Sequence, residues 1–228
     1  MNTKEYCQSV EQKERLHRQR SSAQSIQEDH SPLVSLNDSG FSLMFEPSLM
    51  EDYDYRVREA VVEKIGRISH RLAEQAKMLV IRSVWRSFEH QRRLWENKFA
   101  VMQKKYPNRT DNEVKVIVSH FIAPPSKSMH ATGGAVDALI FDVKNDCVMD
   151  FGNNDGLKLE LNETCYPHHP DISPLAQRNR KLLMDLFVAE DFIVDILEYW
   201  HFDYGNASWA AEKGQAHARY GVIDELVS

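Results

Sequence analysis

The sequence lacks any apolar run of about 18 residues, the length that a membrane-spanning helix needs, so no transmembrane helix is expected. Its N-terminal segment is charged and lacks the apolar core of a signal peptide. Cysteine is scarce: Cys7, Cys147 and Cys165 are odd in number, scattered, and form no Cys-x-x-Cys pair. These absences argue against a disulfide framework and for a reducing compartment, so we expect a cytoplasmic protein.

An excess of positive charge is also absent. The 28 Lys and Arg residues are outnumbered by 34 Asp and Glu residues, which gives a formal net charge of −6. A broad basic surface is therefore not expected, and nucleic acid is a poor candidate partner. The hydrophobic fraction of 42%, with ten Phe, eight Tyr and four Trp, is sufficient for a well-packed core. No feature of the sequence indicates an oligomeric state.

The chain length suits one domain with an extension. Residues 1–30 are rich in Gln, Glu, Arg and Ser, and such a composition buries little apolar surface. We expect a mobile or loosely helical N-terminal extension there and a single folded domain over residues 31–228.

Hydrophobic periodicity predicts helices alternating with strands. Helices are expected over residues 51–78, 88–105, 111–121 and 174–190, and strands over residues 79–85, 135–141, 192–198 and 201–204. Residues 147–149 could pair with the 135–141 strand, residues 32–50 could form an edge hairpin, and residues 150–170 are expected to form a long loop. This order favours an α+β domain, with helices packed on a mostly antiparallel sheet.

One stretch concentrates the chemistry. Residues 126–137 read Ser-Lys-Ser-Met-His-Ala-Thr-Gly-Gly-Ala-Val-Asp and place His130 and Asp137 on either side of a glycine pair that permits close backbone approach. Far downstream, Glu198-Tyr-Trp-His201 offers a second carboxylate and a second imidazole. His130, Asp137 and His201 form a plausible three-ligand set for Zn²⁺ with a fourth position open to water, which we place at the centre of the sheet. Glu198 is then available as a general base.

Some alternatives stay open. Residues three apart on a regular strand point to opposite faces, so the chain should twist or bulge near Tyr199 and Trp200 if Glu198 and His201 are to meet. His168 and His169 could be ligands instead, although adjacent histidines in a proline-flanked loop more often face solvent. Arg86, at the exit of a core strand, could be a solvated surface residue or a fixed cation facing an oxyanion.

These motifs resemble those of the D-alanyl-D-alanine dipeptidases, a family of zinc enzymes. Ser128-Met-His130 followed by Gly133, Ala135 and Asp137 fits the pattern Ser-x-His-x-x-Gly-x-Ala-x-Asp, and Glu198-Tyr-Trp-His201 resembles the Glu-x-Trp-His motif. Trp85-Arg86 is similar to the Tyr-Arg motif of the wider group of zinc D,D-peptidases, and the likeness extends from about Lys64 to Gly214.

The resemblance implies a role for each matched position. His130, Asp137 and His201 would bind one zinc ion per chain, Glu198 would be the base, and Arg86 would stabilise the tetrahedral intermediate. Ser128 would line a small substrate pocket. The family's aspartate for the substrate ammonium has no unambiguous counterpart, because residues 149–156 are shorter than the family pattern. Asp155 is the first candidate and Asp150 the second, although Asn-Asn-Asp-Gly could equally be an ordinary turn.

The resemblance therefore implies zinc-dependent hydrolysis of D-alanyl-D-alanine or a closely related D,D-dipeptide, with a small dipeptide as partner and neither nucleic acid nor membrane. One alternative is a zinc D,D- or L,D-carboxypeptidase acting on murein peptides. Another is a non-catalytic zinc-containing module that binds peptides, which the presence of both Glu198 and Arg86 disfavours.

Overall fold

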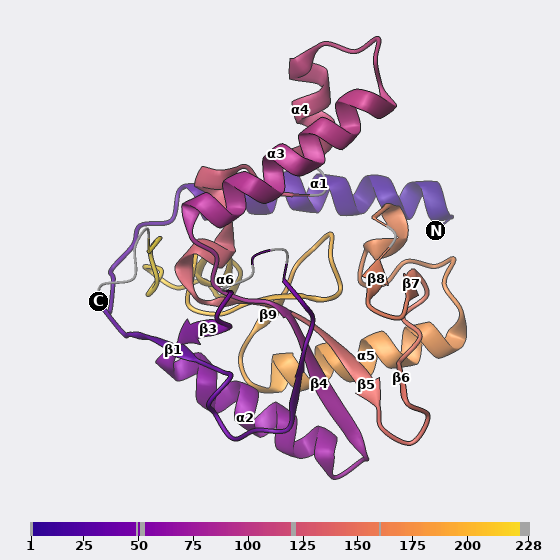
Figure 1. The fold of residues 1–228 in the computed structure, drawn as a ribbon. Coiled ribbons are helices and arrows are strands. Elements are labelled where there is room, and N and C mark those ends of the chain that lie inside the picture. Colours follow the sequence, from indigo (N-terminus) through magenta and orange to yellow (C-terminus); the bar gives the residue numbers. More distant parts are fainter. Residues whose placement is uncertain (1, 49, 51–52, 120–121, 160, 224–228) are drawn as a thin grey trace.

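The computed structural model describes residues 2–48, 50, 53–119, 122–159 and 161–223. Its centre is a six-stranded sheet with the order β2-β4-β5-β10-β9, in which β6 also pairs with β5 (Figure 1). The strands are β2 (Leu43–Phe45), β4 (Lys77–Ser83), β5 (Ala135–Asp142), β6 (Cys147–Val148), β9 (Ile193–Val194) and β10 (His201–Asp203). Among the pairings of this sheet that the structure describes, β2–β4 is parallel and the others are antiparallel. The expected α+β class with a mostly antiparallel sheet is confirmed.

Two amphipathic helices supply much of the apolar core. On α2 (Glu59–Ala73) the inward side chains Val61, Ile65, Ile68 and Leu72 recur at three- and four-residue steps and are completely buried. The second helix, α5 (Pro174–Ala189), starts at a proline after the cap Ser173, whose hydroxyl accepts the N–H of Ala176. Both helices share one cluster with β4, β5 and β10, so the site-bearing strands lie on a packed support.

The N-terminal extension forms a regular helix, α1 (Thr3–Ser22), which is indigo in Figure 1. Its few buried side chains, Cys7, Val10, His17 and Ser21, follow one face. His17 Nε2 lies 3.0 Å from Ser208 Oγ of α6 (Ala207–Lys213), a helix that the sequence reading did not include. Composition shows how little apolar surface this segment can bury, but it does not indicate polar contacts such as this one with α6.

The expected hairpin over residues 32–50 is wrong. Its first half is β1 (Leu33–Ser35), which pairs antiparallel with β3 (Arg56–Arg58) in a separate two-stranded sheet. Its second half is β2, which joins the main sheet beside β4. The two apolar runs therefore find different long-range partners. The helix predicted over residues 51–78 is also shorter in the structure. Strand β3 occupies Arg56–Arg58 before α2, and strand β4 begins at Lys77 after it.

A helical hairpin lies between the first two site-forming segments. It consists of α3 (Phe88–Lys105) and α4 (Asp111–Ser119), close to the predicted ranges; the end of the second prediction, residues 120 and 121, lies outside the described part of the chain. The hairpin has a small core of its own, formed by Met102, Val114 and Val118, and projects from the body of the molecule (Figure 1).

The segment 150–170 is irregular, as expected, but it is tied down. It contains the short strands β7 (Asn154–Asp155) and β8 (Lys158–Leu159) and a 3₁₀ turn, Glu163–Cys165. The completely buried Arg180 of α5 donates hydrogen bonds to the carbonyl oxygens of Phe151, Thr164 and Tyr166. Across the helices that the structure describes, none has the combined length and apolar character needed to cross a membrane.

Candidate active site

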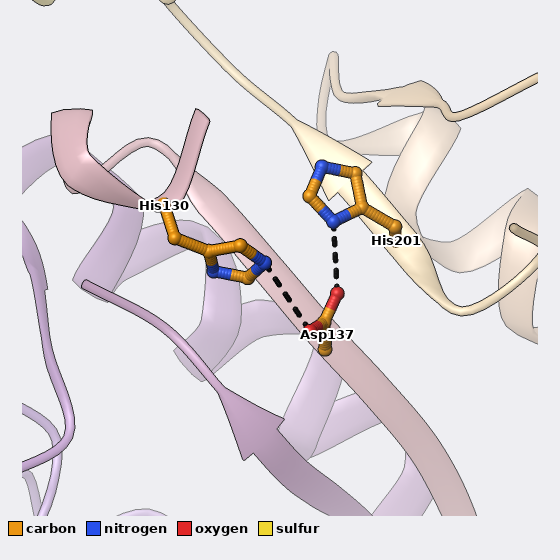
Figure 2. Close-up of side chains that lie close together, drawn as sticks. All are labelled: His130, Asp137 and His201. Atoms are coloured by element: carbon orange, nitrogen blue, oxygen red, sulfur yellow. Dashed lines mark hydrogen bonds and ion pairs between the residues drawn. The ribbon is translucent and has the colours of Figure 1, made fainter. Parts of the chain in front are cut away.

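Asp137 and His201 are brought together by strand register. They are direct partners in the antiparallel pair of β5 and β10, so their side chains share one face of the sheet. Asp137 Oδ1 lies 2.8 Å from His201 Nδ1 (Figure 2).

Gly134 permits this approach of the two strands. A Cβ atom at this position would lie 2.2 Å from the carbonyl oxygen of Tyr204, and the N–H of Tyr204 donates a 2.9 Å hydrogen bond to the carbonyl of Gly134. The predicted role of the glycine pair in close backbone approach is confirmed at this position.

His130 reaches the same carboxylate from a short 3₁₀ turn, Met129–Thr132, that precedes β5. Gly133 ends the turn in the left-handed conformation, with φ of 72°. His130 Nε2 lies 3.2 Å from Asp137 Oδ2 (Figure 2). The other ring nitrogen, Nδ1, lies 2.8 Å from the carbonyl oxygen of Val84. The Val84 carbonyl accepts a hydrogen bond from Nδ1–H, so Nε2 is left with its lone pair directed at the cluster.

These three side chains could hold a metal ion. Each is buried and offers one ligand atom, and the three atoms lie within 4.8 Å of one another. Two imidazoles and one carboxylate are a donor set that suits Zn²⁺, and a carbonyl that fixes the remaining nitrogen of His130 is the usual support of a histidine ligand. Among the residues that the structure describes, no other metal-compatible group of this size was found.

The rival histidine pair lies elsewhere. His168 is exposed, and His169 is buried against α1, with Nε2 lying 3.8 Å from Cys7 Sγ. His169 Nδ1 accepts a hydrogen bond from the N–H of Asp171. Only one of the two histidines faces solvent, and neither is among the three clustered side chains.

Arg86 lies within the site. Its guanidinium donates to Ser83 Oγ at 2.7 Å, to Gln91 Oε1 at 3.0 Å and to Asp137 Oδ2 at 3.0 Å. A shift in the β4–β5 register between Ile81 and Ser83 precedes it. The reading of Arg86 as a solvated surface residue is thereby disfavoured.

Glu198 lies in the connection between β9 and β10, so the strand predicted for residues 192–198 stops at Val194. The expected conflict of faces is removed by a turn: the N–H of Glu198 donates to Asp195 Oδ1 at 3.0 Å, and the N–H of His201 donates to the carbonyl of Glu198 at 3.2 Å. Burial, together with the like charges of Asp195 and Asp137, raises the pKa of the Glu198 carboxyl to about 8.

The electrostatics of the cluster favour a charged Asp137. Burial alone would raise the pKa of Asp137, but the adjacent imidazoles of His130 and His201 hold it well below its usual range. Burial and the nearby Arg86 cation lower the pKa of His130. For His201 burial acts in the same direction, yet the carboxylates of Asp203 and Asp137 outweigh it and raise the pKa well above its ordinary value.

The two predicted substrate residues differ in exposure. Ser128 is buried two positions before His130. Asp155 is exposed in β7, where it pairs with Lys158 of β8. Asp150 is also exposed, and its carboxylate accepts the N–H of Gly152 in a local turn. Contacts with a substrate stay predictions for all three.

The sequence reading missed three residues near the cluster. Asp203 is buried and lies 3.3 Å from His201 Nε2. A carboxylate two positions after a ligand on the same strand shares its face, so the period of two could have indicated it. Tyr53 and His90 form an edge-to-face pair with ring centroids 4.8 Å apart, and the Tyr53 hydroxyl accepts the N–H of Val84. Burial and the nearby Arg86 and His130 lower the pKa of His90 to about 4.

Comparisons with known proteins agree with the motifs. A family model described as D-Ala-D-Ala dipeptidase matches residues 53–220. The D-alanyl-D-alanine dipeptidase of Escherichia coli is 32% identical over 81 residues, a match that covers 36% of this chain and only 40% of that protein.

Two solved structures resemble this chain at low identity. A variant of the vancomycin-resistance D,D-pentapeptidase VanY with Zn(II) is 16% identical, with a TM-score of 0.45 over 83% of this chain and 93% of that one. The LD-carboxypeptidase LdcB is 18% identical, with a TM-score of 0.46 over 82% of this chain and 76% of that one.

Proposed function

The chain belongs to the D-Ala-D-Ala dipeptidase family, and from this premise we propose that it is a zinc-dependent peptidase that hydrolyses D-alanyl-D-alanine or a closely related D,D-dipeptide. The observation that carries the proposal is the convergence of His130, Asp137 and His201 within 4.8 Å, beside the basic side chain of Arg86 and the carboxyl group of Glu198.

The donor set fits one zinc ion per chain, held by His130, Asp137 and His201. When bound there, zinc would supply Lewis-acid polarisation of the scissile carbonyl and would activate water. The chain itself shields the site from solvent, because all three side chains are buried.

Glu198 would act as the general base. Burial and the nearby carboxylates raise the pKa of this carboxyl group above its ordinary value, so it holds a proton more strongly than a solvated glutamate, as suits a residue that takes a proton from the attacking water and gives it to the leaving amine. The turn that links its backbone to Asp195 and His201 holds the backbone position from which its side chain extends.

Arg86 would stabilise the negative charge that develops on the carbonyl oxygen. Its guanidinium is already oriented by Ser83, Gln91 and Asp137, so little reorganisation is needed during the reaction. Ser128 would line the substrate pocket, and Asp155, or failing that Asp150, would bind the substrate ammonium. The cytoplasmic location also belongs to this proposal.

The direct test is to incubate the purified protein with D-alanyl-D-alanine, with and without a chelator, and to measure released D-alanine. We expect release that the chelator abolishes and that added Zn²⁺ restores. A parallel assay on a murein peptide separates a dipeptidase from a carboxypeptidase, because faster cleavage of the longer peptide would overturn the dipeptide assignment.

The variant Glu198→Gln tests the role of the base. It should retain zinc and lose turnover, whereas the matched control Glu63→Gln, at an exposed position of α2, should behave as wild type. Loss of zinc from Glu198→Gln would mean that Glu198 is a ligand. Wild-type protein that binds zinc and peptide without cleavage would instead indicate a binding module.

A further inference from the structure

The second ring nitrogen of His201 has a buried carboxylate partner. While Nδ1 faces Asp137, Nε2 points the other way (Figure 2) and lies 3.3 Å from Asp203 Oδ1. Asp203 follows on the same strand and the same face, and only 1% of its surface is exposed. A carboxylate placed so deeply is costly unless its hydrogen-bonding capacity is used.

Asp203 is itself held in place by the start of α6. The side-chain amide of Asn206 donates to Asp203 Oδ1 at 2.5 Å, and its oxygen accepts the N–H of Trp209 as the helix cap. Asn206 is completely buried, so this small network is shielded from water. The Asp203 carboxylate is therefore held in a fixed position relative to α6 and β10, where it faces the imidazole of His201.

We propose that Asp203 is a positioning residue for the metal site: its carboxylate accepts a hydrogen bond from Nε2–H of His201, fixes the ring, and so directs the Nδ1 lone pair toward the ion. Two different nitrogens would then face the metal, Nδ1 from His201 and Nε2 from His130, whose own Nδ1 is bound by the Val84 carbonyl. Both histidines have an acceptor on the far nitrogen, one a carboxylate and the other a backbone carbonyl, which is the arrangement that fixes tautomers in metal sites.

The difference between the two supports has a chemical consequence. A backbone carbonyl cannot be removed by mutation, but the Asp203 carboxylate can, and its negative charge makes the His201 ring a more basic ligand than a neutral acceptor would. Asp203 should therefore set how tightly the ion is held, without touching the substrate.

The test measures zinc affinity by competition with a chelating dye, in the full chain, for the wild type and the variants Asp203→Asn and Asp203→Ala. Loss of such a partner typically weakens metal binding about 10–100-fold. We expect a loss of this size for Asp203→Ala and a smaller one for Asp203→Asn, whose amide oxygen still accepts a hydrogen bond but carries no charge. The Co²⁺-substituted proteins should show a shifted d–d spectrum in the same order.

Ser208→Ala is the matched control. Ser208 lies in α6, two positions after Asn206, and contacts His17. It has no contact with His201 among the described hydrogen bonds. It should bind zinc as the wild type does. If Ser208→Ala weakened zinc binding as much as Asp203→Ala, the proposal would be overturned, because the loss would reflect general loosening of the structure around α6. Zinc affinity equal to that of the wild type in Asp203→Ala would also overturn it.

The inference rests on the metal site proposed above, but the two fail differently. Wild-type protein that binds no zinc would refute the proposed function. Wild-type protein that binds zinc, with Asp203→Ala equally tight, would refute only the role of Asp203. If Asp203→Ala does not fold, the isosteric Asp203→Asn still decides the question, because wild-type affinity and an unshifted Co²⁺ spectrum in that variant would overturn it.

Discussion

Replacing Arg86 with alanine is expected to reduce kcat far more than KM. The guanidinium donates three hydrogen bonds, to Ser83, Gln91 and Asp137, and is largely buried, with 15% of its side chain exposed. A cation held this firmly stabilises charge that develops only in the transition state. Loss of one such donor costs roughly 10²–10³ in kcat, equivalent to about 2.7–4 kcal/mol.

The same substitution also removes the charge partner of Asp137. Breaking a buried pair typically costs about 3–5 kcal/mol because one charge is left uncompensated. In the zinc-free protein Arg86→Ala should therefore be clearly destabilised, whereas zinc should offset part of this loss by supplying positive charge to the same carboxylate. Urea unfolding with and without a chelator measures the difference.

The assay is steady-state hydrolysis of D-alanyl-D-alanine by zinc-loaded protein, with the metal content of each variant measured. Arg86→Lys should be intermediate, since one ammonium group keeps the charge but cannot reproduce the planar fork. Gln91→Ala is the matched control: it removes one of the three contacts and leaves the charge, so its loss should be smaller. A zinc-loaded Arg86→Ala with wild-type kcat would refute the reasoning.

Three further outcomes are expected. Gly134→Ala places a Cβ 2.2 Å from the Tyr204 carbonyl and should cost about 1–3 kcal/mol or more of unfolding free energy, measured by urea denaturation; an unchanged midpoint would mean that β5 and β10 can separate freely. In the zinc-free protein the folded Glu198, with a pKa of about 8, retains a proton that the unfolded chain releases above about pH 4.3. Stability should therefore fall as the pH rises toward 8, and Glu198→Gln should weaken this dependence; identical pH profiles for the two proteins would contradict the raised pKa. Deleting residues 2–24 removes the buried Cys7, Val10 and His17, so the melting temperature should drop, and a fully retained value would show that α1 adds no stability.

Local pattern was sufficient for the type of several elements. The glycine pair, the β-branched run of β4 and the helical period of α2 each carry their information within a few residues, and β4 lies within two residues of its predicted bounds, whereas α2 is shorter than predicted at both ends. The convergence of His130, Asp137 and His201 could be inferred because all three are side chains that bind zinc, although they lie far apart in the chain.

Long-range pairing was not inferable from local pattern. The apolar runs of β1 and β2 look alike in sequence, yet one pairs with β3 and the other with β4. The packing of α1 depends on contacts with α6, about 190 positions away, which composition cannot indicate. Glu198 was expected on a strand because residues 192–197 are apolar except for Asp195, but the carboxylate of Asp195 accepts the N–H groups of Leu197 and Glu198 and turns the chain there.

The helical hairpin of α3 and α4 leaves the body of the molecule after Arg86 and returns before Ser128. Its two ends are joined at the base, where the N–H of Arg86 donates a 3.3 Å hydrogen bond to the carbonyl of His130 and the side-chain amide of Gln91 donates to the carbonyl of Ala123. With this closure in place, changes at the outer end of the hairpin, beyond the closing residue Gln91, should leave the spacing between Arg86 and His130 unaltered. The outer end of this arm is thus a place where relatives of this protein could diverge, or an engineer could insert a foreign segment, without displacing the candidate active site.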